Sequence, residues 1–173
     1  MKDKLELYLQ TELHFSSIDS KKITYCLEGI LSEMSKLLII FTIAITFGYA
    51  YEVLISTFIL LSIRCNCGGL HFSHYFSCFT FTSVFYLATI ILSQLPLPNP
   101  ILACGLLITL EIFSLIGPIT SPMRPRLTQS DVQKYSSRTT FILLIYSLIL
   151  ILSESLPYRN LIYWVIVLQI FQL

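Results

Sequence analysis

The stretch LLIIFTIAITFGYAYEVLISTFILLSI, residues 37–63, decides the class of fold. Only Glu52 is charged within it, and Arg64 and Glu111 are the only charged residues added before position 124. A soluble domain of this size needs a polar surface, and residues 37–123 cannot supply one. The sequence therefore predicts an integral membrane protein.

The composition of the whole 173-residue chain agrees with this class. Hydrophobic residues make up 55% of it and charged residues 12%, about half of the roughly 25% that is usual in soluble proteins. The mean hydropathy is +0.76. A formal net charge of +1 excludes nucleic-acid binding driven by overall basicity. Disordered and collagen-like chains are excluded as well, and we predict no cofactor.

The cysteines and the first residues indicate whether the chain is a disulfide-bonded secreted domain and whether it begins with a cleavable signal peptide. Five cysteines, an odd number that lies partly within apolar runs, do not suit the disulfide framework of a small secreted domain. The first residues mix acids with lysines, and no unbroken apolar run begins before Leu37, so we expect no cleavable signal peptide. The protein is expected to sit in the membrane by its own helices.

Charge divides the chain into two regions. Residues 1–36 hold 11 of the 21 charged side chains, and apolar residues recur there at helical spacing, so we expect amphipathic helices at the cytoplasmic membrane surface. Residues 37–173 are expected to form an all-α, polytopic transmembrane domain with about six membrane-embedded helices, because roughly 20 apolar residues cross a bilayer. Their predicted ranges are 37–48, 53–63, 75–95, 100–117, 139–156 and 160–173.

The block 37–63 is either one long span or a hairpin with short or re-entrant arms that turns between Gly48 and Glu52. Basic residues decide between the two, because cytoplasmic loops are enriched in Lys and Arg. With a cytoplasmic amino terminus, the hairpin places ten basic residues in the cytosol and only Arg159 outside, whereas a single span divides them six to five. We therefore predict a multi-pass protein of the cell membrane whose amino terminus, segment 64–74 and basic loop 118–138 face the cytosol.

A cluster of reactive side chains follows the second predicted helix. The window from Arg64 to Cys78 contains two of the three histidines and three of the five cysteines. A cysteine nucleophile needs a base. Spacing alone favours His74, which lies four residues before Cys78 and on the same helical face if the helix begins by residue 73. His71 would reach Cys78 only if a turn at Gly68-Gly69 folds it back.

Two other interpretations of the window stay open. The C-x-C and H-x₂-H pattern with a further cysteine could furnish ligands for zinc, although it lacks a paired C-x₂-C. Alternatively, the cysteines are small buried hydrophobic residues, the histidines are interfacial caps, and Gly68-Gly69 is only a tight turn.

The run RCNCGGLHFSHYFSC, residues 64–78, resembles the signature of the accessory gene regulator protein B (AgrB) family, the membrane cysteine endopeptidases of peptide quorum sensing. That signature has an arginine, a Gly-Gly pair, a histidine two residues after the second glycine, and the catalytic cysteine seven residues beyond the histidine. These positions are Arg64, Gly68-Gly69, His71 and Cys78. A second run, GPITSPMRP at 117–125, is similar to a proline-rich basic element of the family, and the length and hydrophobic layout agree over nearly the whole chain.

The resemblance implies a thiol protease that cleaves an AgrD-like precursor peptide. Cys78 would attack the scissile carbonyl and His71 would transfer the proton, which gives an acyl-thioester from which a cyclic thiolactone or lactone autoinducer forms. Its partners would be this peptide and membrane lipids, with no nucleic acid and no metal, and a homodimer is compatible with it. The residues that would support catalysis or bind substrate are Arg64, Gly68, Gly69, Arg124 and Arg126.

The sequence departs from the family pattern in three ways. Phe72 replaces a small residue, Cys65 and Cys67 are additional, and Arg124 and Arg126 stand where lysines are common. None of these removes the cysteine and histidine pair. The rival interpretations are a non-enzymatic membrane transporter or scaffold and a zinc-binding membrane protein. A transporter or scaffold explains the composition equally well but gives the clustered thiols and imidazoles no role.

Overall fold

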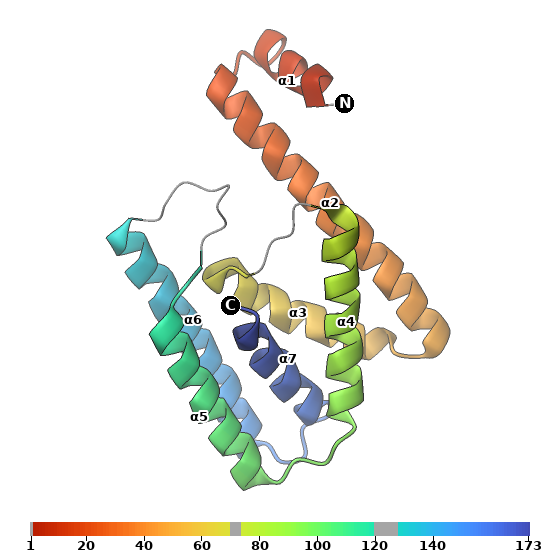
Figure 1. Ribbon diagram of the computed structural model, residues 1–173, viewed down its shortest axis with the longest axis vertical. Helices are drawn as coiled ribbons and strands as arrows, with labels where there is room; N and C mark the ends of the chain where they lie inside the picture. Colours follow the sequence, from red (N-terminus) through yellow and green to blue (C-terminus); the bar gives the residue numbers. More distant parts are fainter. Residues whose placement is uncertain (1, 70–73, 120–127) are drawn as a thin grey trace. The chain divides into compact units, whose positions relative to one another are not determined.

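The computed structural model describes residues 2–69, 74–119 and 128–173, which form seven α-helices and no strand (Figure 1). The predicted all-α class is therefore confirmed. The chain divides into two compact units, Met1–Thr46 and Phe47–Leu173. The helices are α1 (Lys2–Thr11), α2 (Ser17–Phe47), α3 (Ala50–Cys67), α4 (Tyr75–Ser93), α5 (Asn99–Ile116), α6 (Gln129–Leu152) and α7 (Arg159–Phe171).

The helices α2 to α6 are each long and apolar enough to cross a membrane, and α7 is a shorter apolar helix of 13 residues. The shortest of the five long helices have 18 residues, which at 1.5 Å per residue is about 27 Å, close to the thickness of a bilayer core. This set of helices is that of a polytopic membrane protein, as the composition predicts.

The block 37–63 is divided between two helices. α2 ends at Phe47, Gly48 adopts φ 79°, and α3 begins at Ala50. Such a positive φ is readily available to glycine and rare for other residues, so the break occurs where the sequence permits it. In the other direction α2 continues without a break through position 36. Its first turn is capped by Ser16, whose hydroxyl accepts from the Asp19 amide at 3.1 Å. The placement of residues 1–36 at the membrane surface stays a prediction.

The polar segment before the last long helix differs from the expected loop. α6 begins at Gln129, ten residues before the predicted span 139–156 and within the predicted loop 118–138. The physical reason is the cap: the Thr128 hydroxyl accepts from the amide of Asp131 at 3.3 Å and donates to its carboxylate at 2.6 Å. Polar residues that hydropathy assigns to a loop therefore form the first turns of the helix.

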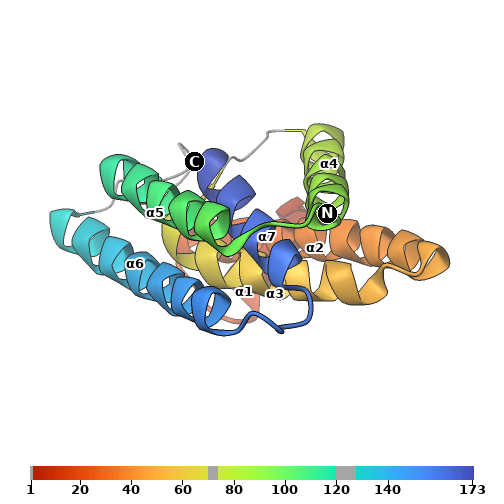
Figure 2. The ribbon, with the colours of Figure 1, turned by 90° about the horizontal axis from the view of Figure 1, so that it is seen from below.

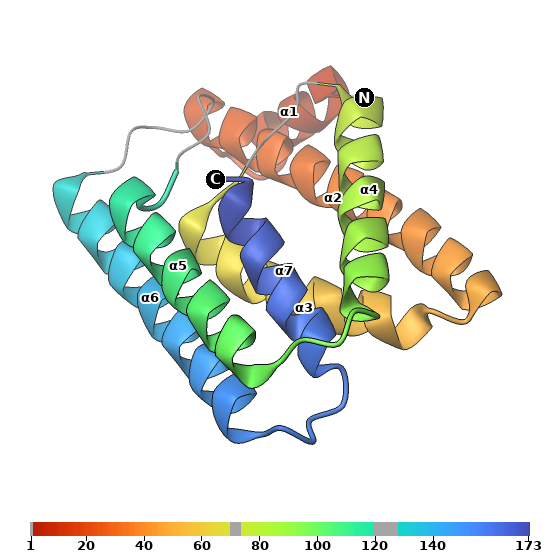
Figure 3. The ribbon, with the colours of Figure 1, turned by 60° about the horizontal axis from the view of Figure 1, so that its bottom comes forward.

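α7 forms the centre of the second unit. It packs against α3, α4, α5 and α6, and Figure 3 shows it between α4 and α5 where it crosses α3. Val165, Leu161 and Ile170 on α7 are almost completely buried. The surrounding helices are joined by hydroxyl pairs, Thr57 with Tyr86 at 2.7 Å and Ser62 with Tyr146 at 3.1 Å. Because α7 contacts four helices, a short segment determines the packing of the unit.

We expect Gly105→Ala to destabilise this packing. A Cβ at Gly105 would lie 1.9 Å from the hydroxyl oxygen of Tyr163 and 2.9 Å from the ring carbon that bears it, so the buried ring must move. Overpacking of this kind costs about 1–3 kcal/mol, measurable as a lower midpoint of thermal unfolding in detergent. Adding Tyr163→Phe, which removes the nearest atom, should recover part of the loss. Gly29→Ala is the control, because nothing lies within 4 Å of that position. Equal midpoints for the two alanine variants would contradict the prediction.

Candidate active site

Cys78 lies in the first turn of α4. Its amide donates to the carbonyl of His74 at 3.2 Å, and its own carbonyl accepts from the Thr82 hydroxyl at 2.8 Å. Only 4% of Cys78 is exposed, whereas His74, Tyr75, Phe76 and Ser77 before it are all exposed. The thiol is thus sheltered, one turn inside the end of an apolar helix whose first turn is open.

His74 does not occupy the helical position that the spacing argument requires. α4 begins at Tyr75, and His74 is its N-cap with an extended backbone, φ −102° and ψ 133°. For His74 to share a helical face with Cys78 the helix must begin by residue 73, and α4 begins two residues later. The preference for His74 from spacing alone is therefore withdrawn.

Arg64, Gly68 and Gly69 form a turn that ends α3. The Gly68 amide donates to the Arg64 carbonyl at 3.0 Å, and Gly68 has φ 80° and ψ −148°, a region that is almost exclusive to glycine. A Cβ at Gly69 would lie 3.3 Å from Arg64 Nε, so the arginine side chain folds against this glycine. The structure therefore brings these three predicted residues together.

The segment after α5 meets this turn. The Ile119 amide donates to the Cys67 carbonyl at 2.9 Å, and a Cβ at Gly68 would lie 2.1 Å from the Ile119 carbonyl oxygen. The two runs that resemble family motifs, 64–78 and 117–125, are thus in contact through their described parts. Sequence reasoning did not predict this contact, because neither spacing nor hydropathy relates residues so far apart.

Gln169 on α7 is the residue that sequence reasoning missed. It is completely buried, and its Nε2 donates to the Gly68 carbonyl at 3.4 Å and to the Cys67 sulfur at 3.8 Å. Its Oε1 accepts from Gln172. One signal was present in the sequence: Gln169 is the only amide between Leu161 and Ile170, and polar groups inside membrane helices are usually hydrogen-bonded and functional.

The other predicted residues fall outside the described ranges. His71 lies between Gly69 and His74, and Arg124 and Arg126 lie between Ile119 and Thr128. Gly69 and Ile119, which immediately precede these segments, belong to the same backbone junction. The start of α4 stands apart from the end of α3 in each view (Figures 1 to 3). Residues 70–73, which include His71, lie between the two helices in the sequence.

The cysteines of the window differ in environment. Cys65 is exposed, whereas Cys67, two residues later on α3, is completely buried, and none of the five cysteines of the chain takes part in a disulfide. Among the described residues, no three His, Cys, Asp or Glu side chains lie close enough to hold a metal ion. The zinc pattern includes His71, which is outside those residues, so the zinc interpretation is not tested.

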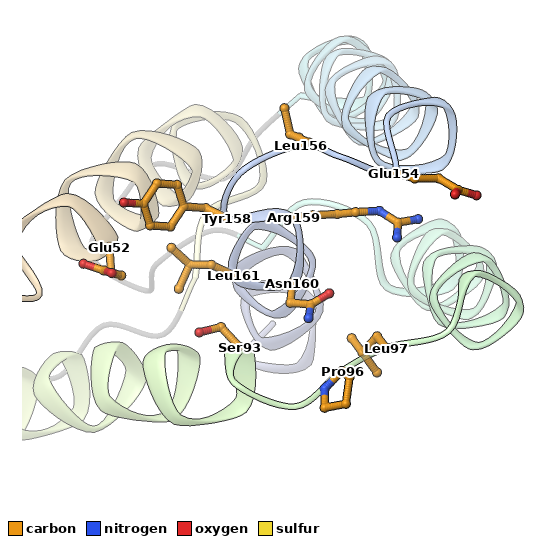
Figure 4. Close-up of a pocket in the computed structure, with 10 residues that line it drawn as sticks. All are labelled: Glu52, Ser93, Pro96, Leu97, Glu154, Leu156, Tyr158, Arg159, Asn160 and Leu161. Atoms are coloured by element: carbon orange, nitrogen blue, oxygen red, sulfur yellow. The ribbon is translucent and has the colours of Figure 1, made fainter.

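A pocket of about 440 Å³ lies at the ends of α3 and α4 that are far from the Gly68-Gly69 turn and Cys78 (Figure 4). It reaches Ser93 at the end of α4, about 22 Å along the helix from Cys78. Its polar side chains stabilise helix ends: Arg159 extends toward α6 and donates to the Leu150 carbonyl at 2.8 Å, and Asn160 donates to the Leu95 carbonyl at 3.0 Å. We therefore assign this pocket to the structure of the loops and not to the chemistry of Cys78.

These features define a helical membrane protein with several spans, in which a buried thiol begins one span and an Arg–Gly–Gly turn ends the span before it. The family model described as accessory gene regulator B (AgrB) matches residues 3–173. An AgrB-like protein of Clostridium beijerinckii is 30% identical over 171 residues, which are 97% of this chain and 84% of the relative. The chain belongs to the AgrB family. The family is known for processing peptides, so membership indicates a role in accessory gene regulator quorum sensing. No solved structure matches the chain.

Gly68→Ala should cost more stability than Gly117→Ala. Both glycines cap helices in similar backbone conformations, with φ 80° and ψ −148° at Gly68 and φ 70° and ψ −172° at Gly117, so both substitutions introduce comparable strain of about 1–3 kcal/mol. Only at Gly68 does the new methyl group overlap a backbone oxygen, while nothing lies within 4 Å at Gly117. Thermal unfolding of the two variants isolates this close approach. Equal losses would show that the contact between Gly68 and Ile119 contributes nothing.

Proposed function

We propose that the protein is a membrane cysteine endopeptidase that cleaves an AgrD-like precursor peptide, with Cys78 as nucleophile and His71 as general base. The observation that carries the proposal is the burial of Cys78, 4% exposed, in the first turn of a candidate membrane span. A reactive side chain at the head of an apolar helix suggests a functional site by default, and its position matches the family signature.

The proposed reaction has two steps. In the first, His71 removes the thiol proton and the Cys78 sulfur attacks the scissile carbonyl carbon. The carbon–nitrogen bond breaks, the leaving amine takes the proton from His71, and the amino-terminal part of the peptide remains on Cys78 as a thioester. In the second, a cysteine thiol or serine hydroxyl of the peptide gives its proton to His71 and attacks the thioester carbonyl. The bond to Cys78 breaks, the Cys78 sulfur takes the proton from His71, and a cyclic thiolactone or lactone leaves.

Exclusion of water supports the second step. Hydrolysis of the thioester competes with ring closure, so a nucleophile in a sheltered position favours the cyclic product. Cys78 is buried, while the residues from His74 to Ser77 are exposed, so the peptide can approach the thiol from the amino-terminal end of α4. We propose that the basic residues Arg124 and Arg126 attract an acidic segment of the precursor or anionic lipids.

Substitution of the proposed residues tests this function. Cys78→Ala should abolish cleavage of a coexpressed precursor peptide, and His71→Ala should lower the rate by about 10²–10⁴-fold, the usual contribution of a general base. His74→Ala and Cys104→Ala are the controls and should keep substantial activity. Mass spectrometry of the peptide and of a covalent adduct, which should be lost with Cys78→Ala, provides the measurement.

The outcomes separate the residue assignment from the class. An inactive His74→Ala with an active His71→Ala would show that the base is misassigned although the class is right. Full activity of Cys78→Ala would refute the cysteine peptidase and favour a transporter or scaffold. Loss of activity with a chelator, without loss on thiol alkylation, would favour zinc.

We further propose that the α3 end and the start of α4 face the cytosol of a cell-membrane protein. Two serines at opposite ends of α6 report on this: Ser130 in its first turn and Ser155 after its end, both exposed. In a variant whose five cysteines are replaced by alanine, Ser155→Cys should react with a membrane-impermeant maleimide on intact cells. Ser130→Cys should react only after the cytosolic side is opened. The reverse pattern would overturn the orientation.

A further inference from the structure

The buried amide of Gln169 has no evident role in the packing of α7. The rest of the buried face of this helix is almost entirely apolar, with Leu161, Val165, Ile166 and Ile170 nearly inaccessible. A primary amide costs free energy to bury unless its donors and acceptor are satisfied, and an apolar side chain of similar volume would fill the same space without that cost. Packing alone therefore does not account for glutamine at this position.

The hydrogen bonds of Gln169 indicate what the amide does. Its donor group reaches the Gly68 carbonyl at 3.4 Å and the Cys67 sulfur at 3.8 Å, both at the end of α3, and its acceptor is occupied by Gln172. A Cβ at Gly69 would lie 3.6 Å from Gln169 Nε2, so the amide also lies against the second glycine of the turn. Both hydrogen bonds that the donor group makes to described residues therefore go to the Cys67–Gly69 turn.

The turn that Gln169 contacts lies next to the two segments that contain the other proposed site residues. Gly68 has no side chain to fix its orientation, and its backbone conformation is one that few residues share. The segment that follows it along the chain contains His71 and leads to Cys78. Ile119, which precedes the segment with Arg124 and Arg126, is bonded to Cys67. A side chain that holds the Gly68 carbonyl therefore acts on the point from which both segments continue.

We propose that Gln169 is a positioning residue for peptide cleavage: by holding the Gly68 carbonyl it fixes the turn that ends α3, three residues before His71 in the sequence. The inference rests on the proposed peptidase function. Gln169 does not touch the reacting atoms and acts through the backbone of the turn.

The test compares near-isosteric variants in proteoliposomes with the precursor peptide as substrate. Gln169→Met keeps the volume of the side chain and removes its donor. Rates are normalised to the amount of monodisperse protein that size-exclusion chromatography recovers before reconstitution, so that only folded protein counts. We expect kcat to fall about tenfold with KM within twofold of the wild type, because a misdirected turn impairs proton transfer more than binding. Gln169→His restores an N–H donor and should recover part of kcat.

A matched control lies on the same helix. Gln172→Met makes the same chemical change and removes only the bond to Gln169 Oε1, so kcat should stay within twofold of the wild type. A second readout is independent of cleavage: Gln169 covers the buried Cys67, while Cys65 is exposed in the same helix and serves as the internal reference. In Gln169→Met, alkylation of Cys67 relative to Cys65 should rise severalfold.

The outcomes distinguish the inference from the function on which it rests. If wild-type protein cleaves and Gln169→Met has an unchanged kcat, Gln169 does not position the active site and the inference is overturned. It is also overturned if activity falls only in proportion to the amount of monodisperse protein, which would show a purely structural role. If wild-type protein does not cleave at all, the proposed function has failed, and unchanged protection of Cys67 in Gln169→Met would overturn the positioning role as well.

Discussion

The missing side chain of Gly68 is the constraint on which the rest of the site depends. Its backbone lies so close to Ile119 that a Cβ would overlap the carbonyl oxygen of that residue at 2.1 Å. This close approach lets the Ile119 amide reach the Cys67 carbonyl and leaves the Gly68 carbonyl for Gln169. Three segments that are distant in the sequence thereby meet: the end of α3 and the residues after α5 through backbone groups, and the end of α7 through the side chain of Gln169. Such a junction is stiff, because it depends on peptide groups and a buried amide and not on mobile surface side chains.

The apolar blocks of the sequence predict much of the fold, since hydropathy reports directly which segments avoid water. The break at Gly48 was also predictable, because this glycine and Glu52, four residues later, interrupt an otherwise apolar block. The start of α6 was not, because the Thr128 cap competes with the polarity of the residues that follow, and the cap prevails. The central place of α7 could not be predicted either. With 13 residues this helix is shorter than the five candidate spans, and its length says nothing of its position, which depends on which side chains fit together, as Tyr163 does against Gly105.

The site residues likewise differ in whether local sequence or the packing of distant helices places them. Local spacing correctly grouped Arg64 with Gly68 and Gly69, because a helix end and the turn after it are short-range structures. It failed for His74, where the argument required a helix start that differs by two residues from the observed one. Local spacing could not relate Gln169 and Ile119 to the turn, because they contact it only once α7 and the segment after α5 have packed against the end of α3. The sequence carried a hint of Gln169 in the polarity of one residue on an apolar helix, but it contained nothing that names the partner.

The different burial of the three cysteines in the window favours Cys78 over its neighbours on physical grounds. The proposed thioester would have to last until a peptide group attacks it, so it needs protection from water, which the exposed Cys65 lacks. Cys67 is protected, but by the junction itself: a peptide could reach its sulfur only by displacing Gln169 and separating backbone groups that hold α3 against the segment after α5. Cys78 meets both requirements, because its side chain is buried while the four residues before it are exposed. A nucleophile that must admit a peptide and exclude water belongs at such a boundary, and of the three thiols only that of Cys78 lies there.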